Sequence, residues 1–149
     1  MRLVIQRVLE GSVLVEGSPV GSIGPGLLVL VGLTHDDGPD QFQAVARKLV
    51  RMRLWHSEER TWDLSVVQKG YELLLVSQFT LHAVLKGNKP DFHQAMRSDQ
   101  ALELFNQFVE QVGREYDPSK VQTGAFGQYM NVHLVNDGPV TIHYDSKKN

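Results

Sequence analysis

Cysteine is absent from this chain of 149 residues. The absence excludes a disulfide framework, a thiolate zinc site, an iron–sulfur cluster and a cysteine nucleophile, and it fits a reducing compartment. Long apolar stretches are absent too: the longest, Leu27 to Val31, is much shorter than the roughly 18 residues of a membrane-spanning helix. The first residues lack the apolar core and the cleavage site of a signal peptide. We therefore expect a cytoplasmic protein that makes no contact with membranes.

A large excess of charge of either sign is also missing, because the formal net charge is -2 at pH 7. A protein that wraps long nucleic acid needs many cations for the phosphates, so we expect no DNA partner. Contact with only the end of a nucleic acid stays open. The length fits one domain over residues 1–149, which buries about two-thirds of the surface of the extended chain and needs no disulfide or metal to fold.

Motifs of cofactor chemistry are missing as well. The chain has no glycine-rich phosphate loop ending in Lys-Ser or Lys-Thr, no dinucleotide-binding fingerprint and no Gly-x-Ser-x-Gly nucleophile motif. Its six histidines include no His-x-His or His-x-x-x-His pair with metal-ligand spacing. The sequence therefore shows no recognisable motif for binding a nucleotide phosphate, a dinucleotide or a metal.

Apolar periodicity predicts two helices. The segment Asp36-Asp37-Gly38-Pro39 supplies cap candidates and a proline that suits the first turn, and an apolar stripe follows at helical spacing. Ser98 is predicted to cap a second helix with a second stripe. The two stripes consist of Phe42, Val45, Ala46 and Leu49, and of Leu102, Phe105, Val109, Val112 and Tyr116.

Short β-prone segments separated by glycine and proline predict the strands. The apolar run at 27–31 does not alternate, which is typical of a strand covered on both faces. The order strands, helix, strands, helix, strands favours an α/β fold with a mixed, largely antiparallel sheet and two main helices packed on it. A polar loop is expected over 82–97. The predicted strands are residues 2–8, 12–15, 20–23, 27–31, 72–77, 130–135 and 140–144.

Two short polar segments carry the candidate chemistry. Ser77-Gln78-Phe79-Thr80-Leu81 directly follows an apolar strand, so it is either a polar strand end or a site fixed by that strand. Asn136-Asp137-Gly138-Pro139-Val140-Thr141 is either a hairpin turn or a second part of a site. Its Gly138-Pro139 bond is a candidate for the cis form, which X-Pro bonds adopt at modest cost.

Together these two segments resemble the two signature motifs of the D-aminoacyl-tRNA deacylases. The resemblance extends over essentially the whole chain. Its further matches are Met1-Arg2, Gln6-Arg7-Val8, the segment 26–32, Leu64-Ser65-Val66, Lys86-Gly87-Asn88-Lys89-Pro90 with Phe92, and the segment 123–127 with Met130. The basic loop departs from the family pattern at Lys89, where we expect Arg, and at Asp91, where a small hydroxyl residue is usual. Lysine is only a point charge for a phosphate, so RNA contact there is expected to be weaker.

The resemblance implies a homodimeric esterase without metal or cofactor, with a sheet curled towards a barrel and helices outside. It implies hydrolysis of the ester between a D-amino acid and the terminal adenosine of tRNA, and of mischarged glycyl-tRNA. A non-catalytic module that binds the tRNA acceptor end remains the alternative, and a purely structural protein is a further one.

Site residues carried over from the family fall into three groups. Ser77, Gln78, Phe79 and Thr80 are the expected catalytic segment. Gly138 and Pro139 of one subunit, with a cis bond, are expected to enter the pocket of the other, and together with Leu81 and Val140 to bind substrate and reject L-amino acids. Lys86 and Lys89 are the expected tRNA contacts.

The catalytic group is left with two interpretations. Thr80 is one candidate nucleophile, but no histidine is visibly placed to activate it, and an unactivated hydroxyl is a poor nucleophile. The favoured interpretation has main-chain N–H groups near Phe79 and Thr80 stabilising the oxyanion, while the 2′-hydroxyl of the terminal adenosine helps to position or activate water.

Overall fold

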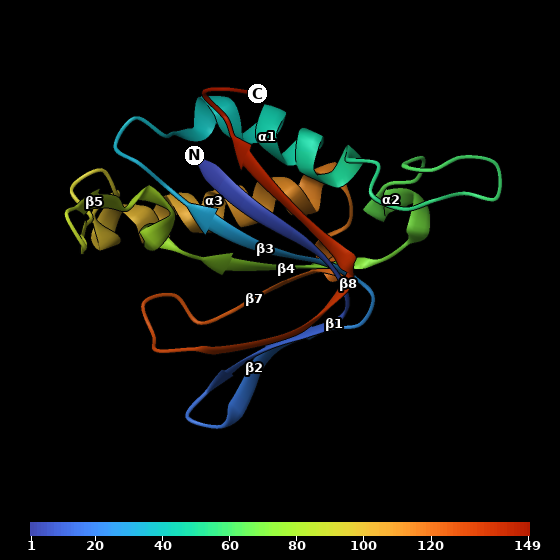
Figure 1. Cartoon of the computed structure of the whole chain (residues 1–149), viewed down its shortest axis with the longest axis horizontal. Helices are drawn as coiled ribbons and strands as arrows, with labels where there is room; N and C mark the ends of the chain where they lie inside the picture. Colours follow the sequence, from blue (N-terminus) through green and yellow to red (C-terminus); the bar gives the residue numbers. More distant parts are fainter.

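The computed structural model describes all 149 residues, and a strongly curled mixed sheet forms its centre (Figure 1). The long strand β1 pairs antiparallel with β2, β3 and β8, whereas β4 lies parallel to both β3 and β7. The curl brings β2 against β7, so the sheet is nearly closed. The predicted α/β class and the curl towards a barrel are thereby confirmed. The strands are β1 (Arg2–Val15), β2 (Ser18–Ile23), β3 (Gly26–Gly32), β4 (Glu72–Ser77), β7 (Val121–Thr123) and β8 (Asn131–Asp145).

Both predicted main helices are present and cover one face of the sheet (Figure 1). Helices α1 (Pro39–Arg51) and α3 (Ser98–Glu115) pack on each other, and the rings of Phe42 and Phe108 meet edge to face with centroids 5.6 Å apart. The first stripe and the α3 residues Phe105, Phe108 and Val112 are buried against Leu27, Val29 and Leu73 and form the larger hydrophobic cluster. The predicted second stripe is partly wrong: Leu102 is exposed, and Phe108 takes its place on the buried face of α3. One face of the sheet is therefore covered by helices. The other face lines the inside of the curl.

The helix starts differ from the prediction in their caps. The N-cap of α3 is Arg97, so Ser98 is the first helical residue and its side chain caps nothing. Gly38, which lies in the predicted cap segment, is the N-cap of α1, but no side chain caps this helix. Asp37 instead accepts hydrogen bonds from the Thr34 N–H (2.7 Å) and from the Met1 ammonium group (2.6 Å). A buried carboxylate gains more from a cation than from a helical N–H, which explains the difference.

Several small elements lie in segments predicted as loop. The segment 82–97 contains a hairpin of β5 (Val84–Lys86) and β6 (Lys89–Asp91). The other small elements are α2 (Val66–Lys69), η1 (Phe79–His82) and η2 (Pro118–Lys120). Each has at most four residues, which is too short for an apolar period to appear in the sequence.

The strands at both ends of the chain are longer than predicted. Gly11 does not interrupt β1, and residues 131–145 form one strand rather than two. The pairing with β1 slips between Thr141, which faces Gln6, and Asn136, which faces Val8. Four residues of β8 thus stand opposite one residue of β1. We call residues 137–140 the arch; the hairpin interpretation of this segment is wrong, because the strand continues beyond it.

Candidate active site

The first motif starts at the carboxyl end of β4 and turns at once into η1. The Gln78 N–H donates to the Val31 carbonyl of the neighbouring strand at 2.8 Å, which ends the parallel ladder. Helix η1 then lies directly on the end of β3. A Cβ at Gly32 would stand 2.9 Å from the Leu81 Cβ and 3.0 Å from the Gln78 carbonyl oxygen, so only glycine allows this approach.

Two side chains hold η1 in place through hydrogen bonds to main-chain carbonyls. Arg2 donates through Nη1 to the Leu81 carbonyl at 2.8 Å and through Nε to Asp145 at 3.3 Å. His82 is buried, and its Nε2 lies 3.1 Å from the Gly32 carbonyl, to which it donates. Burial lowers the pKa of His82, against the opposing effect of that hydrogen bond. His82 is therefore a neutral structural residue whose Nε2 is already occupied, which fits the absence of an activating histidine for Thr80.

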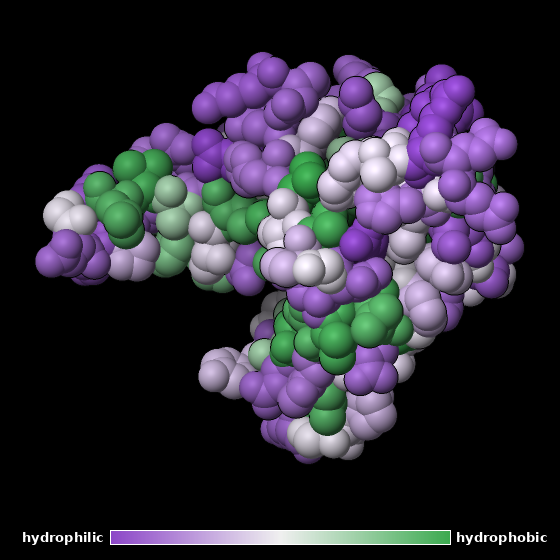
Figure 2. Space-filling model, turned by 45° about the vertical axis from the view of Figure 1, so that its right-hand side comes forward, coloured by the Kyte–Doolittle hydropathy of each residue, from purple (hydrophilic) through white to green (hydrophobic).

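A large cleft opens beside the first motif, with a volume of about 710 Å³. Ser77, Gln78 and Phe79 line it, and the Phe79 ring meets that of Phe92 edge to face at 5.0 Å between centroids. Apolar side chains gather on both sides of the hollow in Figure 2. The volume lies within the range that binds organic ligands. The opposite wall comes from α3, from the turn between β7 and β8 and from the start of β8. It includes Ala101, Phe126, Gly127, Gln128, Tyr129, Met130 and Val132.

Thr80 and Leu81 do not line this cleft in the single chain. Thr80 is exposed on η1, and its carbonyl accepts from the Ala83 N–H at 3.0 Å. Leu81 is half-buried over Gly32 and contributes its carbonyl to Arg2. The N–H groups of Phe79 and Thr80, at the start of η1, have no acceptor within the chain, as is usual for the first N–H groups of a helix.

The second motif forms the arch, which two side chains of the sheet anchor. Arg7 is almost fully buried; its Nε lies 3.2 Å from both the carbonyl and the carboxylate of Asp137, and its Nη1 donates to the Leu54 carbonyl at 2.5 Å. The Asn136 amide donates to the carbonyls of Arg7 (2.9 Å) and Val140 (3.0 Å). Arg7 stands out in the sequence only as part of the resemblance, because nothing in its local pattern reveals a partner 130 residues away.

The tip of the arch is exposed, whereas its end is fixed in the core. Gly138 and Pro139 are exposed, and the bond between them is cis, which confirms that prediction. Val140 is buried in the main hydrophobic cluster. Val140 thus anchors the arch, and only Gly138 and Pro139 are free to meet another molecule.

The two motifs do not meet within one chain. The arch stands opposite Arg7, which pairs with Leu27, and Leu27 pairs with Leu73 of β4; Ser77 lies four residues further along β4. That offset is about 13 Å along the strands. The arch is also separated from β4 by three strand spacings of about 4.8 Å each. The two motifs therefore lie far apart within one chain.

The predicted basic loop is the β5–β6 hairpin beside the cleft. Lys86 and Lys89 are exposed and directly opposite each other in the hairpin. Lys86 Nζ lies 2.8 Å from Asp91, whose carboxylate also contacts the His93 side chain. Hydrogen bonds from Lys86 and then His93 hold the pKa of Asp91 well below its usual range. Asp91 is therefore ionised at neutral pH and partly compensates Lys86, which leaves Lys89 as the freer cation.

The chain has neither a candidate metal cluster nor a helix suited to a membrane. The side chains of His, Asp and Glu form no cluster of three or more that would hold a metal ion. None of the helices combines the length and the apolar character needed to cross a membrane.

Comparison with known proteins identifies the family. A family model described as D-Tyr-tRNA(Tyr) deacylase matches residues 4–145. The chain is 51% identical to D-aminoacyl-tRNA deacylase 1 of Leishmania major, covering 99% of each chain. It is 46% identical to D-aminoacyl-tRNA deacylase 1 of Homo sapiens, covering 98% of this chain and 70% of the human one.

Two solved structures share the fold of this chain. The structure of c-Myc DNA unwinding element binding protein superimposes with a TM-score of 0.94 at 46% identity, over 98% of this chain and 99% of that one. A probable eukaryotic D-amino acid tRNA deacylase shares the fold, with a TM-score of 0.81 at 19% identity, over 96% of this chain and 97% of that one. The chain belongs to the D-Tyr-tRNA(Tyr) deacylase family.

Proposed function

We propose that this protein hydrolyses the ester of D-aminoacyl-tRNA and releases the free amino acid and tRNA. The proposal rests chiefly on the cleft of about 710 Å³ that opens at the first family motif, Ser77 to Phe79. A terminal adenosine with its amino acid is a ligand of the size such clefts bind. The reaction is chiral proofreading in translation, and its place is the cytoplasm, where aminoacyl-tRNA is used.

The working enzyme is a homodimer in which each arch enters the cleft of the other subunit. Gly138 and Pro139 are exposed at the tip of a braced arch, yet they are too far from Ser77 of their own chain to share a site with it. The cleft of a single chain is open on one side, and a rigid main-chain wall from the partner closes it. The completed site then contains both motifs.

Rejection of L-amino acids follows from the rigidity of that wall. The carbonyls of Gly138 and Pro139 accept the ammonium group of the substrate, and the first motif holds the ester. With both groups fixed, an L-residue directs its Cβ into main chain that Arg7 and Asn136 keep from moving. Exclusion by a clash gives larger discrimination than a lost contact. Glycine has no Cβ, so glycyl-tRNA passes the same filter and is also hydrolysed.

Catalysis relies on main chain rather than on a nucleophilic side chain. The unpartnered N–H groups of Phe79 and Thr80 stabilise the oxyanion that forms when water attacks the ester carbonyl. The 2′-hydroxyl of the terminal adenosine positions or activates that water, the ester oxygen leaves as the 3′-hydroxyl, and the amino acid leaves as its carboxylate. An acyl-enzyme formed by attack of Thr80 is the competing route. The variant Thr80→Ala distinguishes the two routes.

Recognition of the rest of the substrate is limited to the acceptor end. Lys86 and Lys89 on the β5–β6 hairpin contact phosphates near that end. The net charge of -2 leaves no large cationic surface for a longer contact.

Turnover of D-Tyr-tRNA tests the activity itself. We expect purified protein to release D-tyrosine in multiple turnovers, and glycyl-tRNA to be hydrolysed as well. Stoichiometric binding of the tRNA without release of tyrosine would instead show a binding module of the acceptor end.

The shared site is tested with two variants that are each inactive for a different reason. Gly138→Val disrupts the arch, because φ is +125° and a Cβ would lie 2.9 Å from the Val140 side chain. Ala95→Trp fills the cleft. Co-expressed, the two variants form a mixed dimer with one intact site, so we expect about half of the activity per mixed dimer. Absence of any recovery, with mixed dimers demonstrated, would show that the site lies within one chain.

A further inference from the structure

An exposed tyrosine lies at the mouth of the cleft and belongs to neither of the two motifs. Tyr129 is 89% exposed, more than any other large apolar side chain of the protein, yet it lines the cleft together with Ser77, Gln78 and Phe79. Such a ring contributes almost nothing to the core. Its position at the cleft therefore points to a ligand rather than to folding.

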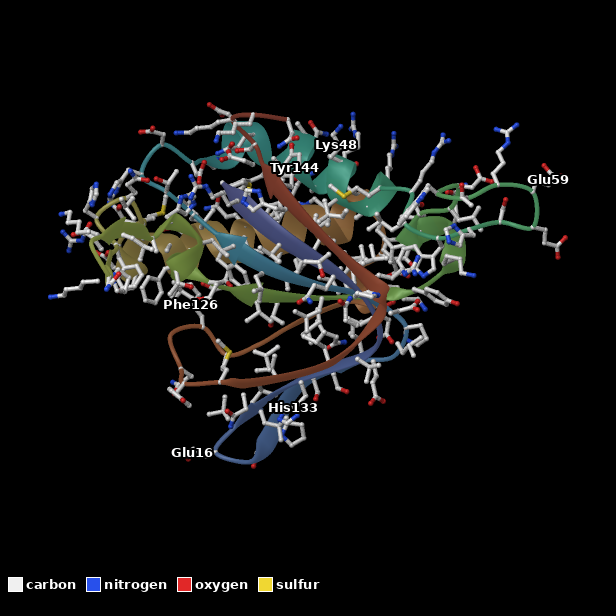
Figure 3. The ribbon with its side chains drawn as sticks, in the orientation of Figure 1. Glu16, Lys48, Glu59, Phe126, His133 and Tyr144 are labelled. Carbon is white, nitrogen blue, oxygen red and sulfur yellow. The ribbon has the colours of Figure 1, made fainter.

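The turn that carries Tyr129 is well supported on both sides. Phe126 packs against Phe105 of α3, with ring centroids 5.9 Å apart. Met130 packs against a second, smaller hydrophobic cluster, which contains Val13 and Leu28. The Gln128 N–H donates to the Ala125 carbonyl at 3.3 Å and closes the turn. Figure 3 shows Phe126 between this turn and the helix-covered part of the molecule. Tyr129 is thus an exposed ring on a fixed support.

The opposite side of the mouth carries positive charge. The turn between β7 and β8 and the β5–β6 hairpin are the two tips on the same side of the molecule (Figure 1), and Phe92, just after the hairpin, lines the same cleft as Tyr129. Lys86 and Lys89 project from the hairpin. Cations on one side and an exposed aromatic ring on the other are the combination with which proteins hold single-stranded nucleic acid, the cations at the phosphates and the ring at a base.

We propose that Tyr129 stacks on the base of the nucleotide that precedes the terminal adenosine of the tRNA. This inference rests on the proposed function, which puts the ester and the terminal adenosine inside the cleft. The single-stranded end must then leave through the mouth, with its phosphates towards the hairpin and its next base towards Tyr129. Tyr129 touches no reacting atom, so it is a positioning residue.

Three substrates separate the base from the phosphate. They are D-tyrosyl-adenosine, a D-tyrosyl cytidylyl-adenosine dinucleotide, and the same dinucleotide with an abasic residue in place of the cytidine. We expect Tyr129→Ala to raise KM about tenfold for the cytidine dinucleotide, because the base loses the aromatic ring on which it stacks. The KM values of the other two substrates and kcat for all three stay unchanged.

Two matched variants separate stacking from mere apolar contact. Tyr129→Phe keeps the aromatic ring, so its KM for the cytidine dinucleotide is expected to equal that of the wild type. Tyr129→Leu removes the ring, so its KM is expected to rise as in the alanine variant. The dependence of log KM on log salt keeps its slope in all three variants, because no phosphate contact is removed. With 89% of Tyr129 exposed, each variant is expected to keep its melting temperature and its dimer.

Three outcomes would overturn the inference. An equal rise in KM for the abasic dinucleotide would show that no base stacks there. A slower reaction of D-tyrosyl-adenosine would show that Tyr129 shapes the cleft itself, and dissociation of the dimer in light scattering would make it an interface residue. If the wild-type protein cleaved none of the three substrates, the proposed function itself would be refuted. Failure of the proposed function is therefore distinguishable from failure of the stacking inference.

Discussion

Loosening the arch is expected to weaken the choice between D- and L-substrates. A wall excludes an L-residue only to the extent that the wall cannot move, so the discrimination is limited by the free energy that holds the arch. Arg7 supplies much of it through its contacts with Asp137 and Leu54. Replacing Arg7 by glutamine keeps an amide that can retain one of these hydrogen bonds but removes the charge and the guanidinium fork.

The magnitude follows from the contacts that are lost. A hydrogen bond to a charged group contributes about 1.5–3 kcal/mol. Because the Asp137 side chain is about one-third exposed, water weakens its share, and we take the loss for Arg7→Gln as about 2–3 kcal/mol in total. At 1.36 kcal/mol per factor of ten, the ratio of kcat/KM for D- over L-substrate then falls by about 30- to 150-fold.

The assay is the release of tyrosine from D-Tyr-tRNA and L-Tyr-tRNA by wild-type and variant enzyme. Most of the change is expected in the L-reaction, which becomes faster, while the D-reaction slows less. The melting temperature should fall by about 4–12 °C from the same loss. Arg47→Gln is the matched control: Arg47 pairs with Glu115 at 3.2 Å on the surface, far from both motifs, and such pairs contribute less than about 1 kcal/mol.

An unchanged ratio in a folded, dimeric Arg7→Gln protein would refute this reasoning. It would mean that the arch is rigid without Arg7, or that the arch does not reject the L-substrate. A lower melting temperature with an unchanged ratio would make Arg7 a purely structural residue.

Three further predictions concern the first motif and its surroundings. Thr80→Ala should keep measurable hydrolysis of D-aminoacyl-tRNA, with a loss of about ten- to a hundredfold or 1.4–2.7 kcal/mol; complete loss with intact tRNA binding, or a trapped covalent adduct, would favour the acyl-enzyme. The double change Lys86→Ala with Lys89→Ala should raise KM for tRNA and reduce the slope of log affinity against log salt by about 1.4, but should hardly affect D-tyrosyl-adenosine. Because burial lowers the pKa of His82 in the folded state, the protein should lose stability as the pH falls below about 6.5. His82→Leu should make acid unfolding, followed by circular dichroism, less steep over that range, and an identical pH profile would exclude His82 as the cause.

The sequence predicted the elements whose signal is local. Apolar stripes of four or five residues located both main helices, and the run from Leu27 to Val31 located a strand covered on both faces, which the buried Leu28 and Val29 confirm. Caps were predicted less well, because Asp37 is engaged by the Met1 ammonium group, a contact between residues 36 positions apart. Local pattern contains no information about such a partner.

The candidate site could be located but not assembled from the sequence. The family motifs identified Ser77 to Phe79 and the cis bond at Gly138, but not the cleft, since its far wall comes from residues near 126–132. The braces Arg7 and Arg2 lie 130 and 79 residues from the carbonyls to which they donate. A single arginine gives no periodic signal, so only the folded sheet shows what these two side chains hold in place.

The most direct test of the account is the ratio of kcat/KM for D-Tyr-tRNA and L-Tyr-tRNA, measured at equal concentrations of the wild-type enzyme. A main-chain wall that excludes the L-residue predicts a ratio of at least about 10³, equivalent to about 4 kcal/mol. Hydrolysis of both enantiomers at similar rates, or of neither, would contradict the account.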